Sequence, residues 1–252
     1  LFLLSALFNS LQKIFLNRSS TFSQSLTYHY HLDTRSYDVL GISIPNFLDV
    51  ATNLIFVLVG LAGVIACAIC LPSKSSISTS EKAGWFIFFV GFSLVSLGSA
   101  YYHWTPNNWT LVWDRLPMTI GFMSLYYIAQ DAYTDSDVTI SLTGNLLLGV
   151  LSMVICVLLQ DILLPYATIQ FYPIVALFVM MVTWPNTAEL SVWYLVPTFV
   201  LYILAKILEA ADLKSNRFYS GTCCGKISGH SLKHLSAGLA AISLIVYVVK
   251  SD

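Results

Sequence analysis

Apolar runs separated by short polar stretches dominate the chain from about residue 50 onward. A helix needs about 20 mostly apolar residues to cross a bilayer, and seven runs reach that length. These runs extend over approximately residues 50–71, 84–103, 111–130, 140–160, 166–184, 191–211 and 230–249. The pattern therefore predicts an all-α, polytopic membrane protein that folds as a bundle of seven transmembrane helices.

Polar and proline-containing breaks divide these runs. Pro72 and a serine-rich loop end the first run, and the tight turn "TPNNWT" joins the second run to the third. The fifth run is the least regular, because Pro165, Pro173 and Pro185 punctuate it. The only sizeable late loop, "LKSNRFYSGTCCGKISG", separates the last two runs, and no soluble domain is evident.

The chain divides into two regions on this pattern. Residues 1–49 form an N-terminal segment, and residues 50–252 form the seven-helix transmembrane domain. The stretch 1–16, "LFLLSALFNSLQKIFL", is apolar but short. A signal-peptide remnant, an amphipathic anchor and the tail of a span all fit it.

Composition supports the membrane class. The chain is 57% apolar and 10% charged, whereas a soluble domain carries about 25% charged residues. The net charge of −1 gives no reason to expect a nucleic-acid partner. Cys67 and Cys70 form a C-x-x-C spacing inside the first run, which we interpret as a pair of packing residues rather than a redox or metal pair.

Ionisable residues inside membrane helices are costly, so each one needs a partner or a function. Two groups of them stand out. The first, at the turn between the second and third runs, contains His103, Asp114 and Arg115. The second, at the end of the sixth run, contains Lys206, Glu209 and Asp212. With seven spans, both groups and the start of the seventh run fall at the same face of the bundle.

Histidines gather at that face. His230 and His234 are four residues apart, so one helical face presents both. His103 ends the second run on the same side of the membrane. Three histidines with one position left for water form the ligand set of a catalytic zinc site. A lone histidine at a helix end is usually only an interfacial group, but three beside Asp114 favour a metal, with zinc ahead of other transition metals.

The same residues carry a resemblance to a known family. Ser99-x-x-x-His103, Asp114 and His230-x-x-x-His234 resemble the alkaline ceramidases, which belong to a superfamily of seven-span membrane hydrolases that includes adiponectin-receptor-like and GPI-lipid remodelling proteins. The sequence around these residues also resembles that family, in the segments "NFLDVATNLIFVLVG", "SLGSAYYHW", "LVWDRLPMTIGF", "AKILEAAD" and "SGHSLKHLSAG". The resemblance covers about residue 38 to the end.

This resemblance implies a zinc-dependent hydrolase that cleaves the amide bond of ceramide-type sphingolipids. It implies that His103, His230 and His234 hold the zinc, with water as the fourth ligand. Asp114 would act as the general base, and Ser99 would help to hold the carbonyl oxygen. The i, i+4 spacing of Ser99 and His103 agrees with this, since one helical face can present both.

Residues around this site have expected supporting roles. Glu209 or Asp212 is a candidate to orient the imidazoles. Lys206 is expected to balance these carboxylates rather than to take part in catalysis. The aromatic-rich runs are expected mainly to pack the helices, although they could also line an acyl tunnel.

One departure from the family concerns calcium. Alkaline ceramidases carry an acidic, tryptophan-containing calcium site before the first span. The comparable stretch here, "HLDTRSYDVLGISIPNFLDV", has Asp33, Asp38 and Asp49 but neither tryptophan nor glutamate, and Asn46 stands where the family has a glutamate. This argues against a calcium site and against strict transfer of the substrate.

Two other functions stay open. An ester-cleaving, phospholipase-like lipid remodelling enzyme could use the same metal site. A non-catalytic receptor could hold zinc for structure alone, and replacing Asp114 would then leave its function intact.

The membrane and the orientation are less constrained. In a eukaryote the resemblance points to the endoplasmic reticulum or the Golgi membrane. The site-bearing side carries more lysine and arginine, which favours a cytoplasmic site, whereas the resemblance implies a lumenal N-terminus. The charges compared are Lys13, Arg18, Arg35, Lys214, Arg217 and Lys226 against Lys74, Lys82 and Lys250.

Overall fold

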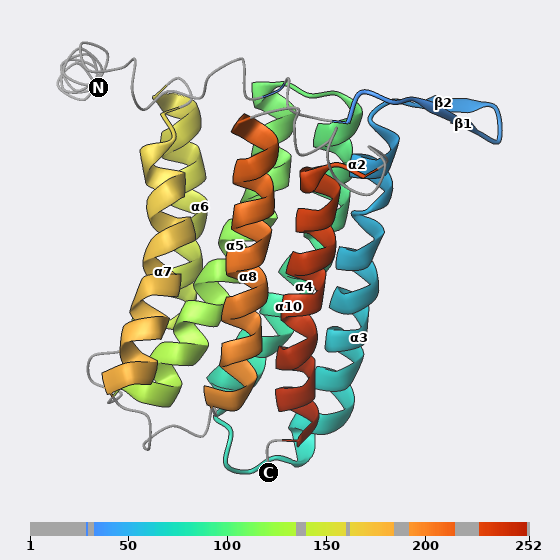
Figure 1. Ribbon diagram of the computed structural model, residues 1–252. Coiled ribbons are helices and arrows are strands. Elements are labelled where there is room, and N and C mark those ends of the chain that lie inside the picture. Colours follow the sequence, from blue (N-terminus) through green and yellow to red (C-terminus); the bar gives the residue numbers. More distant parts are fainter. Residues whose placement is uncertain are drawn as a thin grey trace, which may run out of the picture.

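Seven long helices, aligned roughly side by side, form one bundle (Figure 1). The computed structural model describes residues 29, 33–134, 140–159, 162–183, 192–214 and 227–250. The long helices are α3 (Leu54–Cys70), α4 (Thr79–Trp104), α5 (Asn108–Tyr133), α6 (Leu142–Leu158), α7 (Leu164–Thr183), α8 (Val192–Lys214) and α10 (Gly229–Lys250). The predicted helical bundle is confirmed, and each predicted run corresponds to one of these helices.

Small elements precede and follow the first long helix. A two-stranded antiparallel hairpin pairs β1 (Tyr37–Val39) with β2 (Ile42–Ile44), and the short helix α2 (Phe47–Ala51) follows it. Leu40 and Gly41 both have positive φ at the hairpin turn, as the common two-residue hairpin turn requires. The 3-10 turn η2 (Leu71–Ser73) comes after α3. The hairpin and the separate helix α2 were not predicted.

Five segments of the described residues are long and apolar enough to cross a membrane. They are Phe47–Ser73, Thr79–Trp104, Leu164–Thr183, Trp193–Asp212 and Gly229–Lys250. Helix α5 is long enough but less apolar, and α6 is apolar but has 17 residues. Large apolar side chains such as Ile69, Leu97 and Trp193 are exposed on the outside of the bundle. The protein is therefore a multi-pass membrane protein, since a soluble surface rarely exposes so much apolar area.

Side-chain caps explain several helix starts. The hydroxyl of Ser78 accepts from the backbone N–H of Glu81 and begins α4. Asn107 and Thr110 form a capping box at the start of α5, which is the chemistry of the predicted "TPNNWT" turn. Pro173 lies inside α7, so the irregular fifth run is one helix despite its prolines.

The contacts between the long helices define how the bundle is packed. Helix α4 packs between α3 and α5, and α10 packs against both α3 and α8. Helices α6 and α7 pack against α5 and against each other. Trp85, Phe89, Tyr247 and Leu244 belong to the apolar core, which lies toward the end of the bundle where α10 finishes. Cys67 also lies in this core, as expected for a packing residue.

The opposite end of the bundle is where the ionisable residues gather. Helices α4 and α8 finish at this end, and α5 and α10 begin there, beside α2 and the hairpin (Figure 1). We call it the site end. The predicted convergence of the two ionisable groups and the histidine pair on one face of the bundle is confirmed.

Candidate metal centre

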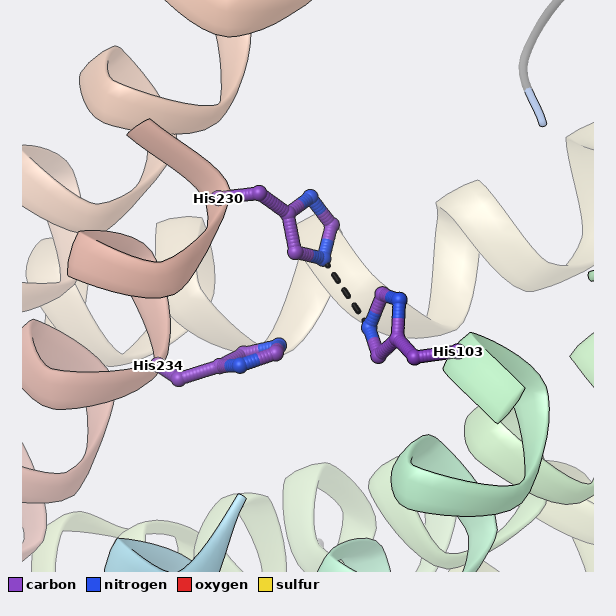
Figure 2. A group of neighbouring side chains, drawn as sticks. All are labelled: His103, His230 and His234. Atoms are coloured by element: carbon purple, nitrogen blue, oxygen red, sulfur yellow. Dashed lines mark hydrogen bonds between the residues drawn. The ribbon is translucent and has the colours of Figure 1, made fainter. Parts of the chain in front are cut away.

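Three buried histidines meet at the site end. His103 projects from the last turn of α4, and His230 and His234 project toward it from the first turns of α10 (Figure 2). Their exposed fractions are 1%, 7% and 1%. One ligand nitrogen from each lies within 4.8 Å of the others, so the three could hold a metal ion.

One pair of the ring nitrogens has the spacing of ligands in a tetrahedral metal site. Nε2 of His230 and Nε2 of His103 are 3.2 Å apart. In a tetrahedral zinc site with the usual metal–nitrogen bonds, two ligand nitrogens are about 3.3 Å apart. Among the described residues, His103 Nδ1 and His234 Nε2 have no hydrogen-bond partner although both are buried. A metal ion would supply a partner for the His234 nitrogen, which is costly to leave buried and unpaired.

Thr52, just after α2, fixes the tautomer of His234. Its hydroxyl donates to the carbonyl oxygen of Leu48 at 2.7 Å and lies 2.9 Å from Nδ1 of His234. A hydroxyl has one proton, so Thr52 must accept the second bond and Nδ1 must carry the hydrogen. Nε2 of His234 therefore keeps its lone pair free for a metal. Such outer partners orient the ligands of metal sites.

Two carboxylates hold the N-terminus of α10, which carries two of the histidines. Asp49 is fully buried, and its Oδ1 accepts from the hydroxyls of Ser228 and Ser231 at 2.8 and 2.6 Å. Asp212 accepts from the backbone N–H of His230 at 3.2 Å. Negative charge is favourable at a helix N-terminus, so both acids stabilise this one. Asn46 makes a similar contact with the end of α4, which carries the third histidine: its side-chain N–H donates to the carbonyl oxygen of His103 at 2.7 Å.

Ser99 and Asp114 lie on neighbouring helices and line one cavity with His234. Ser99 is buried, and the half-buried Asp114 is near enough to His103 to act on it electrostatically. The contact between α4 and α5 depends on Gly98, since a Cβ there would overlap with the carbonyl oxygen of Trp113. Gly98 directly precedes Ser99 in the chain, and Trp113 directly precedes Asp114. The glycine therefore lets the two predicted catalytic side chains approach the same space.

The cavity has a volume of about 340 Å³ and two chemically different parts. Its polar part contains Ser99, Asp114, Arg115, Lys206, Glu209, Lys233 and His234. Its apolar part continues between the helices toward the core and is lined by side chains that include Phe88, Phe122, Leu177, Phe199 and Leu244. Along α10, the ten residues from His234 to Leu244 correspond to about 15 Å. The cavity could therefore accept an extended acyl chain with its polar end beside the histidines.

The supporting residues take partly different places from those expected. Glu209 accepts from Lys206 and, at 3.1 Å, from Lys233 rather than from an imidazole. The prediction that Lys206 balances a carboxylate is confirmed. Among the remaining histidines, His29 bonds to Tyr102 and Asn108, and His31 lies outside the described residues.

Two of the three acidic residues in the segment before α3 are linked to each other, and the third lies apart from them on the hairpin. Asp33 pairs with Arg35 at 2.8 Å, and its backbone N–H donates to Asp49. Asp38 is exposed on the hairpin.

Sequence reasoning missed Thr52 and the roles of Asn46 and Asp49. The sequence did contain one indication of where α10 begins, because Ser228 and Ser231 have the spacing of a helix N-cap and the third residue of the helix. Nothing in the local sequence around Thr52 indicates its histidine partner, which lies 182 positions further on.

Comparison with known proteins adds no assignment. No protein-family model matches the chain, and no curated protein matches it.

Proposed function

We propose that the protein is a seven-span membrane hydrolase that uses zinc to cleave the amide bond of ceramide-type lipids. One observation carries the proposal: His234, which belongs to the buried group of three histidines, lines a cavity together with Ser99 and Asp114, and this cavity continues as an apolar channel. An acyl-lipid amide has the same division into a polar bond and an apolar tail. Helices α5 and α6 would be the two further spans, since they align with the other five.

His103, His230 and His234 would hold the zinc, because they supply three neutral imidazoles and leave a fourth position open. When bound there, zinc makes a water acidic and polarises a carbonyl oxygen. Asp114 would accept the proton from the attacking water and return it to the leaving amine. Ser99 would donate its hydroxyl to the developing oxyanion, a contact of the kind that often contributes a few kcal/mol to the transition state.

The apolar part of the cavity would hold the acyl chain. Its aromatic and aliphatic lining excludes water from the tail, and its polar part keeps the amide beside Asp114. The bond to be cut in ceramide joins a polar backbone to such a chain, at the depth of the lipid head groups. The geometry of the cavity thus supports a lipid amide over a small soluble substrate.

Metal analysis and turnover together test the proposal. Purified wild-type protein is expected to contain zinc and to hydrolyse a labelled ceramide, and His230→Ala is expected to lose both. Asp114→Asn is expected to keep the metal and to lose turnover by about 10²- to 10⁴-fold. Zinc retained in His230→Ala with unchanged turnover would refute the site.

The same assay separates the other functions. A labelled phospholipid offered in place of ceramide distinguishes an ester-cleaving enzyme from an amidase. A protein that binds zinc but turns over neither lipid, with Asp114→Asn indistinguishable from wild type, would be a receptor.

A further inference from the structure

A cluster of charged residues in the cavity has no role in the chemistry described so far. Lys206 and Glu209 lie one turn apart on α8, and Lys233 lies on α10. Oε1 of Glu209 accepts from Lys233 Nζ at 3.1 Å, and Oε2 accepts from Lys206. We call these three residues the lysine–glutamate cluster. Two ammonium groups thus share a single carboxylate.

The charges of the lysine–glutamate cluster do not balance, because the ammonium groups of Lys206 and Lys233 share the one carboxylate of Glu209. Asp212, which is also close, is outside the cavity lining and bonds to the start of α10. A metal on the histidines would add further positive charge. Excess charge in a largely apolar cavity is costly, so the cavity favours a ligand with a negative charge.

The cluster sits beside the place where the bond would be cut. Lys233 directly precedes His234 in the chain, and both line the cavity. The Nζ atom of Lys206 lies 5.6 Å from the centroid of the Phe171 ring, where the polar part of the cavity meets its aromatic lining. Side chains of the cluster are mostly covered, with exposed fractions of 31% for Lys206, 19% for Lys233 and 11% for Glu209. An anion bound there would be shielded from water, which strengthens its attraction to the lysines.

We propose that the lysine–glutamate cluster is a head-group subsite that selects acyl lipids carrying a carboxylate or phosphate close to the bond that is cut. This inference rests on the proposed function and narrows its substrate class. The lysines would pair with the anionic head group, the amide would lie beside Asp114, and the acyl chain would enter the apolar part. Glu209 would hold the two ammonium groups in place and reduce their mutual repulsion.

A purely structural role makes a different prediction. If the cluster only ties α8 to α10, then removing any of its members weakens the protein and affects neutral and anionic lipids equally. If it is a head-group subsite, Lys206→Met and Glu209→Gln have opposite effects on anion binding. The first removes a positive charge from the cavity, and the second increases the positive excess.

Binding is tested with two non-hydrolysable lipids that share a chain, hexadecyl phosphate and hexadecanol, added to the full-length protein in lipid nanodiscs. Titration of the intrinsic tryptophan fluorescence is expected to give about ten- to a hundredfold tighter binding of the phosphate. Lys206→Met and Lys233→Met should remove most of this preference, Lys206→Arg should keep it, and Glu209→Gln should increase it. Lys82→Met, at the other end of α4, is the matched control and should change nothing. Equal binding of both lipids by wild type, or equal weakening of both by Lys206→Met, would overturn the subsite.

Turnover then identifies the head group. N-dodecanoylglycine is compared with N-dodecanoylethanolamine for a carboxylate, and a phosphorylated ceramide is compared with the same ceramide unphosphorylated for a phosphate. Faster hydrolysis of one anionic member, abolished in Lys206→Met, assigns that head group. Preferential binding of hexadecyl phosphate without hydrolysis of any amide would support the subsite and refute the amidase. Hydrolysis of both neutral amides at rates that Lys206→Met leaves unchanged would support the amidase and refute the subsite.

Discussion

At the scale of single residues, the hydroxyl of Thr52 decides which nitrogen of His234 is available to a metal. Because Thr52 donates to Leu48, it can only accept from the imidazole, and the hydrogen must lie on Nδ1. A metal ligand whose tautomer is fixed in advance needs no rearrangement when the ion binds. The contribution of Thr52 is therefore to metal affinity, and it should be measurable without any assay of turnover.

Thr52→Val keeps the shape of the side chain and removes the acceptor. We expect zinc affinity to fall by about 10- to 100-fold, as for other partners of metal-bound histidines, and we expect Thr52→Ser to retain it. Competition with a fluorescent chelator measures both. Thr183→Val is the matched control, since Thr183 makes the same bond to the carbonyl oxygen four residues earlier but has no histidine partner among the described residues. Equal affinity in wild type and Thr52→Val would show that the tautomer needs no such support.

At the scale of helices, two contacts place the catalytic candidates. Gly98 allows α4 to touch the backbone of α5, and Asp49 ties α2 to the first turn of α10. Both contacts lie within a few residues of a histidine or of Asp114. Changes in them should therefore alter the stability of the protein and the geometry of the site together.

Gly98→Ala should force α4 and α5 apart, because the added methyl group meets the carbonyl of Trp113 rather than a flexible side chain. We expect a loss of about 1–3 kcal/mol in unfolding free energy, read from thermal or denaturant unfolding in detergent, together with loss of turnover. Gly121→Ala is the control, because a Cβ at Gly121 meets nothing within 4 Å. A helix-interior alanine with room for its methyl should be neutral or slightly stabilising. Equal stability of the two variants would contradict the proposed contact.

Asp49→Ala should leave the hydroxyls of Ser228 and Ser231 without their buried acceptor. A lost buried partner typically costs about 1–3 kcal/mol, so we expect a clear drop in unfolding temperature and weaker zinc binding. Asp38→Ala, on the exposed hairpin, should change stability by no more than about 0.5 kcal/mol. If zinc affinity survives in Asp49→Ala despite the lower stability, α10 is positioned by other contacts.

The limits of sequence reasoning are visible at this same scale. Hydropathy predicted each long helix to within a few residues, because bilayer thickness sets both the length and the composition of a span. The first predicted run lies within one candidate span, Phe47–Ser73, but the hydropathy pattern did not show that α2 and α3 are separate helices with Thr52 and Asn53 between them. The three histidines could be predicted to converge because an even number of runs, the third to the sixth, separates His103 from His230, so both fall on the same face. The partners of Thr52 and Asp49 could not, since they depend on how distant helices are rotated about their axes, which a hydropathy pattern does not specify.

At the scale of the whole molecule, the alternation of helix directions places the hairpin and the end of α10 at opposite ends of the bundle (Figure 1). An odd number of membrane crossings puts them on opposite sides of the bilayer. Six or eight crossings would put them on the same side. The arrangement therefore gives a direct test of the proposed span count.

Single cysteines at Leu40 and Lys250, in a chain whose five native cysteines are replaced, provide that test. Leu40 is fully exposed at the hairpin turn, and Lys250 ends α10. A membrane-impermeant thiol reagent should label one position in sealed vesicles and the other only after permeabilisation. Labelling of both from the same side would contradict seven spans, and the side that reacts at Leu40 gives the orientation of the site.

The placement of two of the three ligands on α10 also bears on how the protein is made. Helix α10 is the last of the long helices along the chain and packs against α3 and α8, so its two histidines are synthesised after all the other helices of the bundle. A ribosome-bound intermediate that lacks α10 would contain only one of the three imidazoles, that of His103, and would therefore bind a metal ion very weakly. If the protein binds a metal at this site, metal capture would thus be a late step in biogenesis, and it would report that the last of these helices has been inserted in the correct orientation.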